Sequence, residues 1–268
     1  MSFKATIENN EICKHLINMF EIISDVLTND YININKNYIE INAMDSNKVS
    51  LIHFRLSKNS FKNYNYTFDS HQQLGVNFQE LIKILKLYKI NDVITFEYSQ
   101  NKLDQLTIIL KNDQITQNFS LKLLSIDTEI VDITDIKHSI DIDINTNLFK
   151  QILKIFDTIN NDSVDFCIDK NTLNIIANGD SSRSNILFNE NRTTNYKFNS
   201  CKGTFKNTYG TEFLKKYKKS INDSINISFS ECQPLILKIN LKSTTLNPEE
   251  NIDYGFLNYY IAPKIDEN

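Results

Sequence analysis

The sequence contains one pattern twice, and this repeat constrains its fold more than any other feature. Residues 41–54 form a short apolar segment, an Asp-Ser turn and a second alternating segment, and residues 175–188 repeat this order. The two copies begin 134 residues apart, at Ile41 and Ile175, which is half of the 268-residue chain. A repeat of this length predicts two similar domains.

Four segments have the apolar periodicity of amphipathic helices, two in each half. In the first half, residues 11–23 and 78–89 are expected to be helical, and in the second half residues 147–159 and 211–221. The expected apolar stripes are Ile12, Leu16, Phe20 and Ile23; Leu81, Leu85 and Tyr88; Leu148, Ile152, Ile155 and Ile159; and Phe213, Leu214, Tyr217 and Ile221.

The rest of each half contains short β-branched and aromatic segments typical of strands. The clearest are residues 93–98, 106–110, 119–123, 225–230 and 235–241. This order predicts an α+β fold with antiparallel sheets and two helices layered on one face in each half. We expect domains at residues 1–124 and 138–268, joined by an extended acidic connector at residues 125–137.

Composition excludes several classes of protein. No apolar run approaches the roughly 18 residues of a membrane span, and the start of the chain has no apolar stretch of signal-peptide length. The cysteines at positions 13, 167, 201 and 232 form no CxxC pair and have no histidines at zinc-ligand spacing. We therefore expect no metal, cofactor or membrane, and a protein that stays in its compartment or enters the nucleus with a partner.

Lysines gather on the polar faces of the four predicted helices, although the net charge of the chain is −4. If the helices line one surface, an acidic protein acquires a basic wall suited to phosphate contact without base reading. A solvated helix face is the ordinary alternative for any one helix. The candidate contacts are Lys14, His15, Lys83, Lys86, Lys89, Lys150, Lys154, Lys215, Lys216, Lys218 and Lys219.

Three multi-residue blocks resemble the proliferating cell nuclear antigen (PCNA) family of DNA sliding clamps. Residues 44–51 (MDSNKVSL) resemble its Met-Asp-Ser signature, residues 75–86 its Gly-Val-Asn helix, and residues 259–265 (YYIAPKI) its C-terminal ending. The resemblance covers essentially the whole chain. It implies a ring of six similar domains, usually three identical subunits, with helices lining the hole, sheets outside and duplex DNA passing through.

The resemblance also implies partners and a nuclear location, or a viral replication compartment for a viral protein. The family is loaded by an ATP-driven clamp loader and tethers DNA polymerase and other proteins, without being an enzyme itself. Proteins with PCNA-interacting peptide motifs insert a short helical plug into a pocket. Matched position by position, that pocket comprises Met44, Lys48, Val49, Leu51, Val131, Ile133, Pro234, Tyr260, Ala262 and Pro263.

Ring closure in the family implies pairing between edge strands of neighbouring subunits. The expected interface residues are Phe119, Leu121, Arg183, Ile186 and Phe188. The chain departs from the family pattern at several positions, and the family's regulatory lysine is displaced by one position near Asp169 and Lys170, to which no modification role is transferred. Glu21 stands where lysine is common, Lys48 where histidine is common, and Val131 where leucine is common, so the basic wall and the partner preference are expected to differ.

Other functions fit the sequence less well. Gly179-Asp180-Ser181 is similar to a serine-hydrolase motif, but the last histidine, His138, precedes the serine. The dispersed carboxylates do not suggest a two-metal nuclease. Three alternatives stay open: a subunit of a heteromeric checkpoint-type clamp, a monomeric viral processivity factor, and an interaction scaffold that does not encircle DNA.

Overall fold

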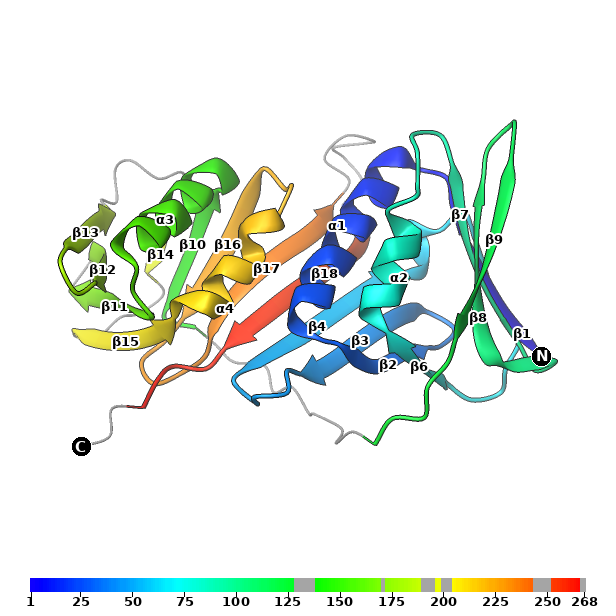
Figure 1. Ribbon diagram of the computed structural model, residues 1–268, viewed down its shortest axis with the longest axis horizontal. Coiled ribbons are helices and arrows are strands. Elements are labelled where there is room, and N and C mark those ends of the chain that lie inside the picture. The colour runs from blue at the N-terminus through cyan, green and yellow to red at the C-terminus, as the bar shows by residue number, and fades with distance from the viewer. Residues whose placement is uncertain (128–137, 170–171, 189–195, 199–203, 243–251, 266–268) are drawn as a thin grey trace. The chain divides into compact units, whose positions relative to one another are not determined.

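The computed structural model describes residues 1–127, 138–169, 172–188, 196–198, 204–242 and 252–265 (Figure 1). The chain forms two compact units. Unit 1 comprises Met1–Ser46, Ile52–Val131 and Asn240–Leu257, and unit 2 comprises Asn47–Leu51, Asp132–Ile239 and Asn258–Asn268. Among the helices of the described ranges, none is both long enough and apolar enough to cross a bilayer.

The first half of the chain alternates strands with two α-helices. Its elements are β1 (Ser2–Ile7), α1 (Asn10–Val26), β2 (Asn29–Ile34), β3 (Tyr38–Met44), β4 (Ser50–Ser57), the 3-10 turn η1 (Lys58–Ser60), β5 (Asn63–Tyr66), β6 (Gln72–Asn77), α2 (Phe78–Leu85), β7 (Val93–Ser99), β8 (Lys102–Lys111) and β9 (Thr116–Lys122).

The second half repeats this order. Its elements are β10 (Ile140–Asn145), α3 (Thr146–Ile159), β11 (Ser163–Asp169), β12 (Thr172–Asn178), β13 (Arg183–Phe188), β14 (Tyr196–Phe198), β15 (Phe205–Gly210), α4 (Thr211–Lys215), the 3-10 turn η2 (Lys216–Lys219), β16 (Ser224–Phe229), β17 (Leu235–Lys242) and β18 (Asp253–Ile261).

The strand order repeats as closely as the sequence does. The order β5-β1-β7-β8-β9 in the first half has its counterpart in β14-β10-β16-β17-β18, and β4-β3-β2-β6 corresponds to β13-β12-β11-β15. Strands β18 and β4 are hydrogen-bonded neighbours, and the registers of the other pairs are antiparallel wherever they are described. The predicted α+β fold with two similar domains is confirmed.

Asparagine side chains begin three of the helices. Asn9 accepts hydrogen bonds from the backbone N–H groups of residues 11 and 12, Asn77 from residue 80, and Asn145 from residue 147. An asparagine at this position satisfies amide groups that have no partner within the helix. These three capping asparagines therefore help to set where α1, α2 and α3 start.

Two helices are shorter than predicted. Helix α2 ends at Leu85, because the following turn is held by Tyr88 Oη donating to Asn10 Oδ1 and by Lys89 N donating to Asp92 Oδ2. Helix α4 ends at Lys215 and continues as the 3-10 turn η2. The tighter turn accompanies complete burial of Tyr217, whose hydroxyl donates to Leu237 O at 3.2 Å.

The apolar stripe predicted for α3 was wrong by about one position. Ile152 is buried, but Leu148 is 38% exposed. The buried face instead carries Phe149, Leu153 and Phe156 together with Ile152. The two phenylalanines bury more apolar area than Leu148 and Ile155, so they decide which way the helix faces.

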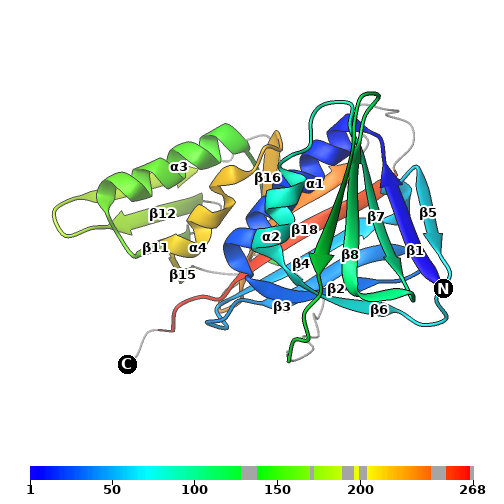
Figure 2. The same cartoon turned by 45° about the vertical axis from the view of Figure 1, so that its right-hand side comes forward.

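In unit 1, α1 and α2 lie side by side against one face of the β4-β3-β2 strands (Figures 1 and 2). Phe20 of α1 packs on Phe54 of β4, with ring centroids 5.4 Å apart. Unit 2 has the same layering, because α3 and α4 bury Phe156 and Leu214 against Phe166 and Ile175 of β11 and β12. In each unit the polar faces of the helices therefore point away from the sheets.

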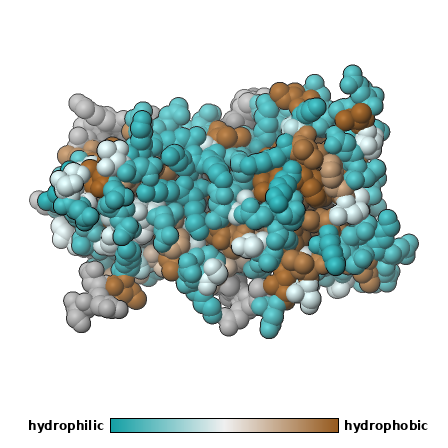
Figure 3. Space-filling model, in the orientation of Figure 1, coloured by the Kyte–Doolittle hydropathy of each residue, from teal (hydrophilic) through white to brown (hydrophobic). Residues whose placement is uncertain are grey.

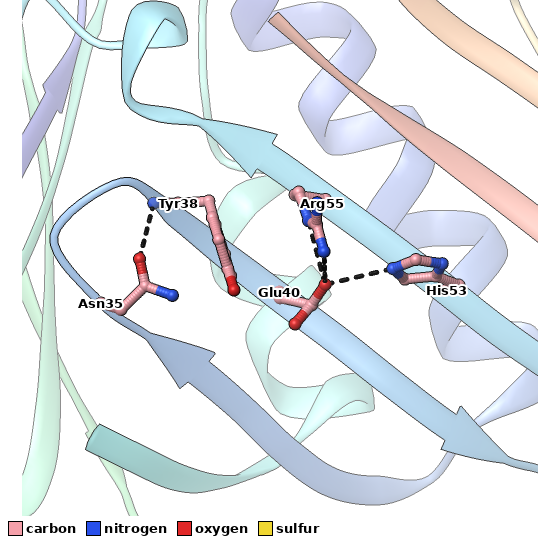
Figure 4. A network of polar contacts seen from close by, with 5 residues as sticks. All are labelled: Asn35, Tyr38, Glu40, His53 and Arg55. Atoms are coloured by element: carbon pink, nitrogen blue, oxygen red, sulfur yellow. Dashed lines mark hydrogen bonds and ion pairs between the residues drawn. The ribbon is translucent and has the colours of Figure 1, made fainter. Parts of the chain in front are cut away.

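The opposite face of the β3 and β4 strands carries a polar network (Figure 4). Glu40 Oε1 accepts a hydrogen bond from Arg55 Nε at 2.9 Å. The same oxygen lies within hydrogen-bond distance of His53 Nε2, at 3.1 Å. The Arg55 guanidinium lies over the ring of Tyr38, 4.4 Å from its centroid, and within 5.8 Å of Phe256. This half-buried network ties three strands of unit 1 together on the side away from the helices.

Candidate nucleic-acid interface

The helix pair of unit 1 presents both signs of charge. Lys14, Lys83, Lys86 and Lys89 are all exposed, as their spacing predicted, although Lys89 lies in the turn beyond α2. Lys83 Nζ pairs with Glu80 Oε1 at 2.6 Å on the same helix. Lys86 Nζ pairs with Glu21 Oε1 at 2.5 Å, which links α2 to α1. These two ammonium groups are thus partly neutralised by neighbouring carboxylates.

His15 has a different environment from the lysines. Its side chain is half-buried on α1, and its Nδ1 atom has no hydrogen-bond partner within the described residues. The buried Nδ1 atom is therefore not available to a phosphate.

The helix pair of unit 2 is more basic. Lys150 and Lys154 project from successive turns of α3, and Lys215, Lys216, Lys218 and Lys219 follow one another through α4 and η2. Lys215 Nζ lies 2.9 Å from Asp157 Oδ1, and Lys218 Nζ lies 3.4 Å from Asp157 Oδ2. The hydrogen bond from Lys215 is the main reason why the pKa of Asp157 is lowered.

An open groove runs between α3 and η2 in unit 2. It is lined by Lys150, Gln151, Lys154, Asp157, Thr158 and Lys218. Hydrophilic side chains predominate over α3 and α4 in the space-filling view (Figure 3). The groove offers ammonium groups without an aromatic stacking surface, which suits phosphate contact independent of sequence.

Most of the expected partner-pocket residues that the structure describes lie in unit 2. Val49 O accepts a hydrogen bond from Ala262 N at 2.9 Å, so the Met-Asp-Ser signature lies beside the C-terminal segment. Leu51, Pro234, Tyr260 and Pro263 are half-exposed. Lys48 is exposed and has a positive φ of 56°. Met44, which is 37% exposed, belongs to unit 1.

The start of the expected connector follows the edge of a sheet in unit 1. Leu124 N donates to Gly75 O of β6 at 2.8 Å, and Tyr31 Oη donates to Ile126 O at 2.5 Å. A Cβ atom at Gly75 would lie 2.1 Å from Leu124 O, so glycine permits this close approach. Val131 and Ile133 lie outside the described residues.

The expected subunit-interface residues lie on two strands at sheet edges. In the described residues, β9 ends the order β5-β1-β7-β8-β9, and β13 ends the order β13-β12-β11-β15. Phe119 and Ile186 are half-buried, Arg183 is exposed, and Leu121 and Phe188 are buried. Leu187, next to the predicted residues, is 55% exposed on a strand that ends its sheet among the described residues.

Sequence reasoning missed the Glu40, His53 and Arg55 network. The signal was present, because Tyr38 and Glu40 alternate on one strand and His53 and Arg55 alternate on the next. The groups of histidine, cysteine, aspartate and glutamate side chains needed for a metal site are absent from the described part of the chain.

The chain matches two family profiles that together span it almost completely. Residues 2–131 match "Proliferating cell nuclear antigen, N-terminal domain", and residues 132–264 match "Proliferating cell nuclear antigen, C-terminal domain".

Curated relatives align over nearly the full chain. Proliferating cell nuclear antigen 1 of Plasmodium falciparum (isolate K1 / Thailand) is 26% identical over 276 residues, covering 99% of this chain and 97% of that protein. The probable DNA polymerase sliding clamp 1 of Paramecium bursaria Chlorella virus 1 is 27% identical over 261 residues, covering 91% of each.

A solved structure has the same fold. The crystal structure of the proliferating cellular nuclear antigen from Entamoeba histolytica superimposes with a TM-score of 0.83, at 19% identity, over 98% of this chain and 99% of that one. Together with the two family profiles, the repeated strand order and the paired helices, this shows that the chain belongs to the proliferating cell nuclear antigen family.

Proposed function

We propose that the chain is the subunit of a DNA sliding clamp, a ring that encircles duplex DNA and holds DNA polymerase and other replication or repair proteins on it. Membership of the PCNA family is the observation that carries this proposal. Weak phosphate contacts let such a ring slide, while encirclement keeps it on the DNA. In this proposal the clamp holds its partners on the DNA and does not itself catalyse a reaction.

The strand order supports ring closure by pairing between copies. In the repeat, β9 corresponds to β18 and β13 corresponds to β4. The chain already pairs β18 with β4, and a Cβ atom on Gly255 of β18 would lie 2.2 Å from Arg55 O of β4. If β9 of one subunit pairs with β13 of the next, the same junction recurs between subunits, and three subunits of two domains close a ring of six.

The partner surface is proposed to combine the Met-Asp-Ser signature with the C-terminal segment. The hydrogen bond between Val49 and Ala262 and the half-exposed Pro234 and Tyr260 support it. A short helical peptide with apolar anchors fits such a surface. Residues 125–137 are proposed as the connector that borders it, and an ATP-driven loader as the protein that opens the ring. The site of action is proposed to be the nucleus or a viral replication compartment.

The mass of the purified protein in solution tests the ring. Light scattering at several concentrations and salt levels is expected to give three times 31.2 kDa, or 93.6 kDa. A mass of 31.2 kDa throughout contradicts a self-assembled trimer. It favours either a ring that needs different subunits or a monomeric processivity factor.

A further inference from the structure

Positive charge is distributed unequally between the two helix pairs. In unit 1, residues 10–26 and 78–89 contain four lysines and four carboxylates, Glu11, Glu21, Asp25 and Glu80, so their formal charge is zero. In unit 2, residues 146–159 and 211–219 contain six lysines against Asp157 and Glu212, a formal charge of +4. The repeat has therefore kept the helices in both units but concentrated the basic charge in one.

The described ion pairs also differ between the two units. Lys83 and Lys86 of unit 1 each have a carboxylate to themselves, at 2.6 and 2.5 Å. In unit 2, Lys215 and Lys218 share the single carboxylate of Asp157, so one positive charge there is uncompensated. A phosphate that approaches Lys83 or Lys86 must compete with a carboxylate that pairs with that lysine alone. A phosphate that approaches Lys215 or Lys218 competes with one carboxylate that the two lysines share.

The shape of unit 2 matches its charge. Helix α3 contributes Lys150, Lys154 and Asp157 to the lining of the open groove, and η2 contributes Lys218, whose Nζ lies 3.4 Å from Asp157 Oδ2. Gln151 and Thr158 add neutral polar groups to the same lining. Ammonium groups from two neighbouring elements can contact the same stretch of phosphate backbone.

We propose that this groove between α3 and η2 is the principal contact of the subunit with the phosphates of duplex DNA, and that Asp157 competes with phosphate for Lys215 and Lys218. The proposal rests on the proposed clamp function. Competition by Asp157 keeps each contact weak, which favours sliding over fixed binding. The lysines of α1 and α2 then contribute little direct contact.

Lysine footprinting of the full chain tests where the phosphates bind. The reactivity of each lysine toward an amine reagent is compared with and without a short blunt-ended duplex of mixed sequence. Selective protection of Lys150, Lys154 and Lys218 supports the proposal. Equal protection of Lys14, Lys83 and Lys89 overturns it but leaves the clamp function intact, and no protection anywhere counts against both.

Salt dependence of duplex binding gives a second, quantitative test. Replacing Lys150 and Lys154 by glutamine should reduce the slope of log affinity against log salt by about 2, since each lost phosphate contact removes roughly 0.9. The charge-matched control replaces the exposed Lys36 and Lys58, which lie outside α1, α2, α3, α4 and η2. An equal loss of slope in the control overturns the proposal, because it would reflect net charge alone.

Asp157→Asn tests the competitor. The variant should bind the duplex several-fold more tightly and with a steeper salt slope, because Lys215 and Lys218 become available to phosphate. Glu80→Gln makes the same change of net charge beside Lys83 in unit 1 and should have a smaller effect. Unchanged or weaker binding by Asp157→Asn, or an equal gain from Glu80→Gln, overturns this role.

Discussion

Gly255 occupies a position where the backbone conformation and a close neighbour both disfavour any residue with a side chain. It has a φ of +141°, which side chains with a Cβ atom rarely adopt, and the added Cβ would lie 2.2 Å from Arg55 O. Gly255→Ala should therefore lower the free energy of unfolding by at least about 2 kcal/mol, measured by denaturant unfolding. Gly210→Ala is the control, since Gly210 has an ordinary φ of −68° and its added Cβ would meet the Phe213 side chain at 2.9 Å rather than backbone at such close range. Equal losses of unfolding free energy in both variants would show that the positive φ of Gly255 and its approach to Arg55 O impose no special requirement.

The Glu40 network predicts a pH dependence of stability. Burial alone raises the pKa of Glu40, but hydrogen bonds and positive charge from His53 and Arg55 outweigh it, so the pKa lies below its ordinary value of 4.5. A carboxyl group with a lowered pKa stabilises the fold above its unfolded pKa and loses this effect as pH falls through the folded pKa. Near neutral pH, Glu40→Gln should cost about 1–2 kcal/mol.

The measurement is the difference in unfolding free energy between the parent chain and Glu40→Gln as pH falls from 7 to about 3. The difference should be constant above about pH 4.5 and shrink below it. Glu97→Gln serves as the control, because its pair with Lys4 at 2.7 Å is largely exposed and should contribute little. If the difference in unfolding free energy stayed the same in acid, Glu40 would stabilise the fold through packing rather than through its charge.

At the scale of elements, the caps decide how firmly the helices begin. Asn9 accepts from two backbone N–H groups at the start of α1, at 2.9 and 3.1 Å. Asn9→Ala should therefore destabilise the protein by about 1 kcal/mol, whereas Asn9→Ser should largely retain the cap. Thermal unfolding of the two variants compares them directly, and identical melting temperatures would exclude a capping role.

Periodicity predicted the positions of all four described helices but not all of their ends or faces. The ends of α2 and α4 depend on Tyr88 and Tyr217, whose partners Asn10 and Leu237 are distant in sequence. The face of α3 was mispredicted because aliphatic spacing outweighed Phe149 and Phe156. These features are set by tertiary packing, which local patterns do not contain.

The candidate site was predictable in its residue types but not in its electrostatics. The lysine faces follow from helical spacing, and most of the lysines are indeed exposed. The pair between Glu21 and Lys86 joins two helices that are 65 positions apart, so only the structure reveals that this lysine is partly neutralised. The groove beside Asp157 likewise arises from the meeting of α3 with η2.

For the complete protein, the proposed trimer would depend on the edge strands β9 and β13. Ile186→Lys places a charge in the middle of β13 and should shift the trimer toward monomers without unfolding them, because Ile186 is only half-buried. Solution mass is the measurement, with circular dichroism as the check on folding. Ile90→Lys, at a side chain that is 63% exposed after α2, is the matched control and should remain trimeric. Dissociation of both variants would show that the effect of Ile186→Lys is not specific to β13.

Blocking the ends of a linear duplex tests whether the protein encircles DNA or only binds to its surface. Protein is added either before or after both ends are closed by a bound bulky protein, and each sample is washed at high salt, which removes phosphate contacts. Encirclement predicts retention only when the protein is added before closure. Equal retention in both samples, or loss from both, would contradict it.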